Sequence, residues 1–170
     1  MIKEAKDLLE SVIKNRIPNI PVFRSAAAET RAIMARQFPL ISLITNPGGF
    51  DGSEARTVRF FDDGEYKERY VRGARVLPIM IRCWAKGEDE ADAIFSRIIP
   101  AIPSQWGYDG FANHIEIGDE EHSDHAGNVN EMYLSVAVIK FKATAAIDPK
   151  EVPFFIEVKP EEGEIIYEQT

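Results

Sequence analysis

The densest group of metal-binding side-chain types lies between residues 119 and 125, which read DEEHSDH. Imidazole and carboxylate groups are the ligands that zinc and related divalent cations take in proteins. The candidate ligands are His122, His125 and Asp124, and the two histidines are three residues apart, which would place them on one face of a helix. The run is so polar, however, that it predicts a solvated, acidic loop over residues 119–130. We therefore expect no metal and no other cofactor, and we keep a small metal-dependent α+β enzyme as an alternative.

The other side chains with reactive or ligand-stacking chemistry are isolated in the sequence. Cys83 is the single cysteine and lies in an apolar run, which predicts a buried structural thiol and is typical of a reducing cytosol. Trp106, Tyr108 and Phe111 lie in a glycine-containing connection and are expected to close one end of the core, with a ligand-binding module as the alternative. The sequence contains neither a phosphate-binding P-loop nor a G-x-S-x-G nucleophile motif. We therefore expect that the chain is not an enzyme.

Charge is distributed unevenly along the 170 residues. The net charge of -8 argues against general nucleic-acid binding. Residues 56–86 nevertheless carry a net charge of +4, and residues 148–170 carry -5, from seven acids and two lysines. Opposite charges on one chain favour a head-to-tail contact between copies, of the kind that closes into rings. The alternative is that the acidic end is a solvated tail that serves solubility.

The predicted interface residues come from both charged segments. They are Arg56, Arg59, Arg69 and Arg72 in the basic segment, and Phe154, Phe155 and Ile156 in the acidic one. Aromatic residues alternate with the basic ones, so non-specific contact with DNA is a second use for that segment. The apolar run that begins at Pro153 is too apolar to remain solvated alone, and we expect it to pair with an edge of a neighbouring subunit or to lie across it.

Apolar spacing predicts three helices. Residues 2–16 carry an apolar stripe at intervals of three and four, and Pro18 follows their end. Residues 25–37 begin with a capping serine and three alanines. Residues 88–99 open with three acids, which complement the helix dipole, and stop at Pro100.

Strand signals occupy most of the remaining chain. LISLIT at residues 40–45 predicts a buried strand, and an Asp-Gly pair at residues 63–64 predicts a hairpin between residues 57–61 and 65–72. Further strands are predicted at residues 76–84, 113–118 and 131–145, the last apolar on both sides and therefore central in a sheet. A short hairpin is predicted near the C-terminus.

This order of elements predicts an α+β fold. A mainly antiparallel sheet is packed by the N-terminal helix and by the helix at residues 88–99, with a C-terminal β-arm. We expect a core domain over residues 1–147 and an acidic arm over residues 148–170. The N-terminal residues are amphipathic rather than continuously apolar, which does not fit a secretory signal, and no apolar run approaches the ~20 residues needed to span a bilayer.

The layout resembles that of the tail terminator, or tail-completion, proteins of tailed bacteriophages and prophages. The resemblance covers residues 1–147. It lies in the N-terminal helix and proline-bearing link, the apolar strand and hairpin, and the strand-helix unit RVLPIMIRCWAKGEDEADAIFSRII, followed by the long strand EMYLSVAVIKFKATA.

The resemblance implies a structural protein of the virion tail, assembled in the cytoplasm of the bacterial host. Such a subunit forms a homo-oligomeric ring, typically a hexamer. The ring caps the tail tube and joins it to the head-side connector proteins, and DNA passes through its lumen. Another head-tail joining protein or a minor tail protein is the alternative within the same class.

Overall fold

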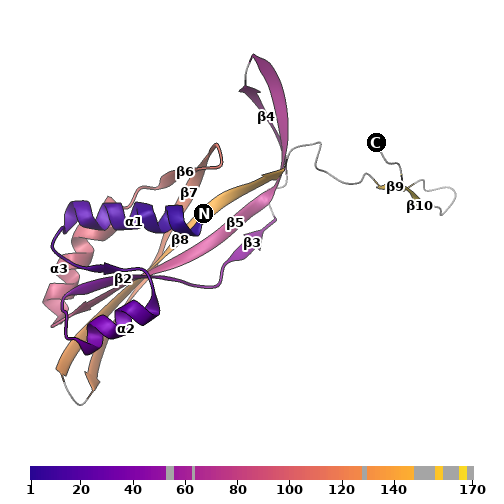
Figure 1. Ribbon diagram of the computed structural model, residues 1–170. Helices are drawn as coiled ribbons and strands as arrows, with labels where there is room; N and C mark the ends of the chain where they lie inside the picture. Colours follow the sequence, from indigo (N-terminus) through magenta and orange to yellow (C-terminus); the bar gives the residue numbers. More distant parts are fainter. Residues whose placement is uncertain (53–55, 63, 128–129, 148–155, 159–164, 168–170) are drawn as a thin grey trace. The chain divides into compact units, whose positions relative to one another are not determined.

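The computed structural model describes residues 1–52, 56–62, 64–127, 130–147, 156–158 and 165–167 (Figure 1). The fold divides into two compact units. One unit comprises residues 1–50 and 75–143, and the other comprises residues 51–74 and 144–170.

The described residues form an α+β fold, as the sequence predicts. Its helices are α1 (Ile2–Arg16), α2 (Ala26–Met34) and α3 (Glu88–Ile98), the last continued by the 3-10 helix η1 (Ile99–Ala101). Its strands are β1 (Val22–Phe23), β2 (Leu40–Thr45), β3 (Gly49–Asp51), β4 (Arg56–Asp62), β5 (Glu65–Ala85), β6 (Gln105–Tyr108), β7 (Phe111–Gly127), β8 (Asn130–Ile147), β9 (Ile156–Val158) and β10 (Ile165–Tyr167).

The main sheet has the order β1-β2-β5-β8-β7-β6, and β3 and β4 also pair with β5. The β1–β2 pair is parallel, whereas β2–β5, β4–β5, β6–β7 and β7–β8 are antiparallel. The strand β8 lies between β5 and β7, which confirms the prediction that residues 131–145 form a central strand. In this part of the chain Tyr133, Leu134 and Ser135 are all buried, because residues on both faces of the strand are covered.

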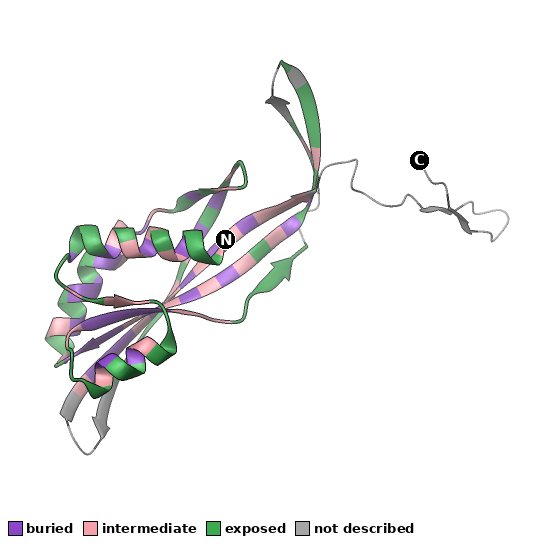
Figure 2. Cartoon of the chain, in the orientation of Figure 1, coloured by how far each residue is buried: buried purple, intermediate pink, exposed green. Residues whose placement is uncertain are grey.

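Two apolar clusters cover opposite faces of the sheet. On one face, α1 and α3 pack against alternate residues of the strands; the cluster includes Leu9, Ile13, Leu43, Ile79, Ile81, Phe95, Ile98, Ile139 and Phe141. On the other face, Ala32 of α2 packs with Leu40, Trp84 and Leu134. Figure 1 shows α1 and α2 on opposite sides of β2, and Figure 2 shows buried and intermediate residues alternating along β5 and β8.

Ion pairs hold α1 to the segment that follows it. The Arg24 guanidinium contacts Asp7 at 2.6 Å and donates two hydrogen bonds to Glu10, from Nε at 2.6 Å and from Nη2 at 2.5 Å. Lys14 of α1 also pairs with Glu10. At the C-terminal end of the helix, Arg97 of α3 donates to the Arg16 carbonyl oxygen at 2.7 Å. These contacts add polar links between α1 and its neighbours to the burial of its apolar face.

The predicted loop over residues 119–130 is wrong. Glu120–Gly127 pair in antiparallel register with β8, so β7 continues through the acidic run to Gly127. Pairing with a long, apolar central strand supplies the backbone hydrogen bonds, and this overrides the low strand propensity of the acidic residues. One irregularity, between Ile117 and Glu120, absorbs the change in register.

The hairpin predicted at residues 57–72 is confirmed within the second unit. Asp62 pairs with Glu65 across a two-residue turn in which Gly64 has a φ of +81°. The two strands predicted at residues 65–72 and 76–84 are, however, one strand, β5. Near its middle, Gly73 has a φ of +148°, and a Cβ atom there would lie 2.1 Å from the Asp51 carbonyl oxygen. Glycine therefore permits this close approach of the Asp51 carbonyl while the strand continues.

A second Asp-Gly turn was missed by the sequence reasoning. Asp109 and Gly110 both have positive φ, 53° and 75°, and join β6 to β7 with Tyr108 opposite Phe111. Positive φ at both central positions is the signature of a type I′ hairpin turn. The aromatic residues near this turn therefore lie on strands and not in an irregular connection.

The C-terminal hairpin is described by its two strands. Ile156 pairs with Tyr167, and Val158 pairs with Ile165, in antiparallel register. The proposed boundary between residues 147 and 148 stays a prediction. In the described part of the chain, no helix is both long enough and apolar enough to cross a lipid bilayer.

Candidate functional site

The hairpin formed by β4 and the first part of β5 carries the four predicted interface arginines. Arg56 is opposite Val71 and Arg69 is opposite Val58, which places these two arginines on one face of the hairpin. Arg59 is opposite Glu68 on the other face, and Arg72 follows on that face by strand alternation. The hairpin therefore separates the four arginines into two pairs.

The face that carries Arg59 also presents two tyrosines. Tyr66 is 75% exposed and Tyr70 is 39% exposed. Between them, Glu68 accepts hydrogen bonds from Arg59, at 2.9 Å from Nε and at 2.5 Å from Nη2. We call Thr57, Arg59, Tyr66, Glu68, Tyr70 and Arg72 the tyrosine face. Its chemistry, flat amphipathic rings beside cations, suits protein interfaces and nucleic-acid backbones.

The apolar residues predicted to act at the C-terminal end are only partly described. Ile156 begins β9 and pairs with Tyr167 of β10. Phe154 and Phe155 lie outside the described residues.

His122, one of the candidate ligands of the alternative metal site, contacts three neighbouring side chains. Its Nδ1 lies 2.9 Å from the Ser135 hydroxyl, and its ring stacks on Tyr133 and meets the edge of Phe95. The side chains of Asp124 and His125 lie outside the described ones, and the argument from helical spacing does not apply because the segment is a strand. Among the described side chains, no group of three or more His, Cys, Asp or Glu residues could hold a metal.

A row of three polar side chains, which sequence reasoning missed, runs from Ser135 through His122 to Glu120. The Glu120 carboxylate lies 3.8 Å from His122 Nε2, and Ser135 lies on the other side of the ring. A serine, a histidine and an acid are also the groups of a nucleophilic triad. Here the Ser135 side chain is fully buried, so a substrate cannot reach its hydroxyl. Cross-strand pairing of His122 with Ser135 explains the contact, and only the strand register could have revealed it.

The aromatic residues near the second Asp-Gly turn divide between core and surface. Trp106 is 7% exposed, stacks on Tyr108 and meets the edge of Phe141, with both pairs of ring centroids 5.1 Å apart. Its indole N–H donates to the Lys142 carbonyl oxygen at 3.4 Å. Trp106 thus closes the core, as expected. Residues 105–112 also line an open hollow of about 540 Å³.

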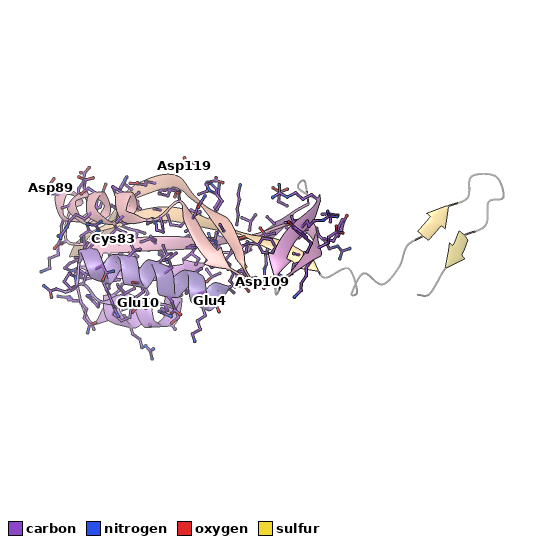
Figure 3. The ribbon with its side chains drawn as sticks, turned by 90° about the horizontal axis from the view of Figure 1, so that it is seen from above. Glu4, Glu10, Cys83, Asp89, Asp109 and Asp119 are labelled. Atoms are coloured by element: carbon purple, nitrogen blue, oxygen red, sulfur yellow. The ribbon has the colours of Figure 1, made fainter. Side chains whose placement is uncertain are left out.

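Cys83 is a buried thiol, as the sequence predicts. Its side chain has no exposed surface, and burial raises its pKa to about 12. In Figure 3, Cys83 lies within the body of the fold, whereas Asp89 of α3 lies at the periphery. A thiol with so high a pKa carries almost no thiolate at neutral pH and does not act as a nucleophile.

The most buried carboxylate of the described chain belongs to Glu29 of α2, which is 3% exposed. Its Oε1 accepts from the Ser42 hydroxyl at 2.8 Å and from the Trp84 indole at 2.6 Å, and its Oε2 accepts from Arg82 at 3.1 Å. Arg82 also lies over the Trp84 ring, 5.6 Å from its centroid. The signal in the sequence is the spacing of Glu29 with Ala32 and Ile33, which puts an acid on the apolar stripe of the helix.

Comparison with known proteins leaves the function open. No protein-family model matches the sequence, and no curated protein matches it. An α+β fold hosts many unrelated functions, so function has to be argued from particular surfaces of this chain.

Proposed function

We propose that this chain is a structural subunit that acts by assembling with other chains and not by catalysis. The observation that carries the proposal is the tyrosine face of the β4–β5 hairpin. Tyr66 and Tyr70 are exposed there beside Arg59 and Arg72. Exposed aromatic side chains that are bordered by charged ones are typical of surfaces that bind a partner.

The energetics of the hairpin favour a partner. A two-stranded hairpin is marginally stable by itself, and of the described side chains from Arg56 to Arg72 only Val71 is buried. Burying the exposed part of Tyr66 against a partner would contribute on the order of 1–3 kcal/mol. A partner that covers this face would therefore stabilise both the contact and the hairpin.

We propose that the assembly is the ring of a phage tail terminator, with a hexamer as the expected form. The layout of residues 1–147 supports this, as does the charge pattern: residues 56–86 carry +4 and residues 148–170 carry -5. Such polarity suits a head-to-tail contact, since opposite charges meet at each interface and the two ends of a ring differ. The partners would be the tail-tube protein on one side and the head-side connector proteins on the other, within the virion tail. The lumen would allow the passage of DNA without reading its sequence.

The test is a tube-length assay with polymerising tail-tube subunits of the same phage. Adding the full-length chain should shorten the tubes in proportion to its concentration, as seen by electron microscopy. The double variant Tyr66→Ser, Tyr70→Ser should lose this effect while keeping its circular dichroism spectrum. Exposed Met34→Ser, on α2, is the matched control and should behave like the parent. Unchanged tube lengths with the parent would contradict the terminator function, and binding to the connector alone would indicate a head-tail joining protein.

A further inference from the structure

The face of the sheet that α2 covers extends beyond that helix. Five apolar side chains continue along this face, all of them intermediate in burial. They are Ile44 of β2, Val76, Pro78 and Met80 of β5, and Val138 of β8. None of the five belongs to the apolar clusters that the described helices complete. We call these five residues the apolar strip.

Strand register places the strip on one face. Ile44 is directly opposite Met80, in the same ladder that sets Leu40 opposite Trp84 beneath α2. Val76 and Pro78 share the face of Met80 because residues two apart in a strand point the same way. Val138 is an even-numbered residue of β8, like Leu134 of the α2 cluster. A row of partly exposed apolar residues on one face of a sheet is unusual, because a face that meets solvent normally carries polar side chains.

Cations border the strip on β8. Lys140 and Lys142 share the face of Val138, and both pair with Glu116 of β7, at 2.7 Å and 3.2 Å. The two ammonium groups share the carboxylate of Glu116, and Asp119 is a second acid that acts on Lys140. The lysines are 40% and 37% exposed and remain accessible to a further acid.

The chain itself contains a segment of matching chemistry. Residues 153–156 read PFFI, with Glu151 before them and Glu157 after them, within a segment that carries -5. An apolar run flanked by acids is complementary to an apolar strip flanked by lysines. The strip and the segment are also two different surfaces of one chain, which is what a head-to-tail ring contact requires.

We propose that residues 151–157 of one copy of the chain dock on the apolar strip of a second copy. The proposal rests on the proposed ring assembly and names the contact that holds neighbouring subunits together. Phe154 and Phe155 supply the buried area, and the flanking glutamates face Lys140 and Lys142. A docked segment also shields the strip, which accounts for apolar residues on a sheet face that α2 leaves open.

Disulfide trapping between two full-length chains tests this contact. One chain carries Met80→Cys and the other, with a different tag, carries Phe155→Cys; the native Cys83 is buried and does not compete. A disulfide forms only where two Cα atoms come within about 7 Å. Mild oxidation should therefore give the mixed dimer on a non-reducing gel. Met34→Cys, a more exposed position on α2, paired with Phe155→Cys is the matched control and should give at least tenfold less. A yield no higher than the control would overturn the proposal.

A second pair of variants separates this proposal from the ring itself. Met80→Glu disrupts the apolar strip and keeps the 151–157 segment. Phe155→Glu disrupts the segment and keeps the strip. By light scattering, each variant alone should lose the ring that the parent forms. Mixed together they should form a dimer and no ring, because only one of the two possible contacts survives. Rings that persist in both variants would overturn the docking and leave the ring assembly standing. A parent chain that is monomeric would overturn the ring, and the docking with it.

Discussion

Replacing Glu29 by alanine should be among the most destabilising single changes on α2. The carboxylate is 3% exposed, and Ser42 and Trp84, which donate to it, are 0% and 8% exposed. Removing it leaves a hydroxyl and an indole N–H buried without an acceptor, at about 1–3 kcal/mol each. It also leaves the guanidinium of Arg82 without its ion pair, although that side chain is 26% exposed and partly rehydrates. We expect a total loss of about 3–5 kcal/mol, in the range for breaking a buried pair.

Glu29→Gln separates the hydrogen bonds from the charge. Oε1 accepts from both Ser42 and Trp84, whereas Oε2 accepts from Arg82. A glutamine with its oxygen at the first position keeps both buried donors satisfied. Its NH2 group then faces the Arg82 N–H, so the ion pair and the hydrogen bond from Arg82 are both lost. We therefore expect Glu29→Gln to cost about 1–2 kcal/mol, well below the alanine variant.

Urea unfolding, followed by circular dichroism and tryptophan fluorescence, measures both losses. Exposed Asp92→Ala on α3 is the matched control, and it should remain within about 0.5 kcal/mol of the parent. The reasoning would be refuted by equal losses for alanine and glutamine at position 29. A loss below about 1 kcal/mol for alanine would refute it equally.

Three further predictions concern α1, the β3 contact and the thiol. Hydrogen bonds and charges from Lys14 and Arg24 lower the pKa of Glu10 below its ordinary value of 4.5 in the folded protein. The stabilisation by ionised Glu10 is complete above pH 4.5 and is lost as the pH falls through the lowered pKa of the folded state. The urea midpoint of the parent should therefore fall with pH in that acidic range, and the midpoint of Glu10→Gln should fall less. Gly73→Ala should lower the free energy of unfolding by about 1–3 kcal/mol or more, measured by thermal unfolding, because Gly73 has a positive φ and a Cβ there would meet the Asp51 carbonyl. Gly49→Ala is the control and should cost far less, because its Cβ would meet nothing within 4 Å. Similar losses for the two variants would contradict the close approach at Gly73. Cys83 should not react with a thiol reagent at pH 8 until urea unfolds the chain, and rapid reaction in the native state would contradict its burial.

Local patterns were sufficient to predict most of the elements. Apolar residues at intervals of three and four predict α1 and α3, and acids in the first turn mark the start of α3. The turn residues predict the hairpin at Gly64. Ser25 caps α2 as expected, accepting from the Ala28 N–H at 3.3 Å. These features depend on interactions within a few residues, which a sequence displays directly.

What could not be predicted depends on partners distant in the sequence. Residues 120–127 look like a loop, because their polar composition does not show that β8 lies beside them. His122 likewise resembles a metal ligand until its cross-strand partner, Ser135, is known. Glu29 looks like a surface acid, since its donors lie on β2 and β5. In each case tertiary pairing decides the role of a polar residue.

The same distinction applies to the candidate surfaces. The sequence identified a basic segment but not the division of its arginines between two faces, which needs the register of β4 with β5. The apolar strip combines residues of three strands, β2, β5 and β8, and so has no local signature.

The mass of the full-length chain in solution tests the assembly most directly. Size-exclusion chromatography with light scattering, over a range of concentrations, compares the measured mass with 19.1 kDa for one chain. The proposed function predicts one closed species at a whole-number multiple of this mass, with six copies as the expected number. A species that remains at 19.1 kDa at every concentration would contradict it.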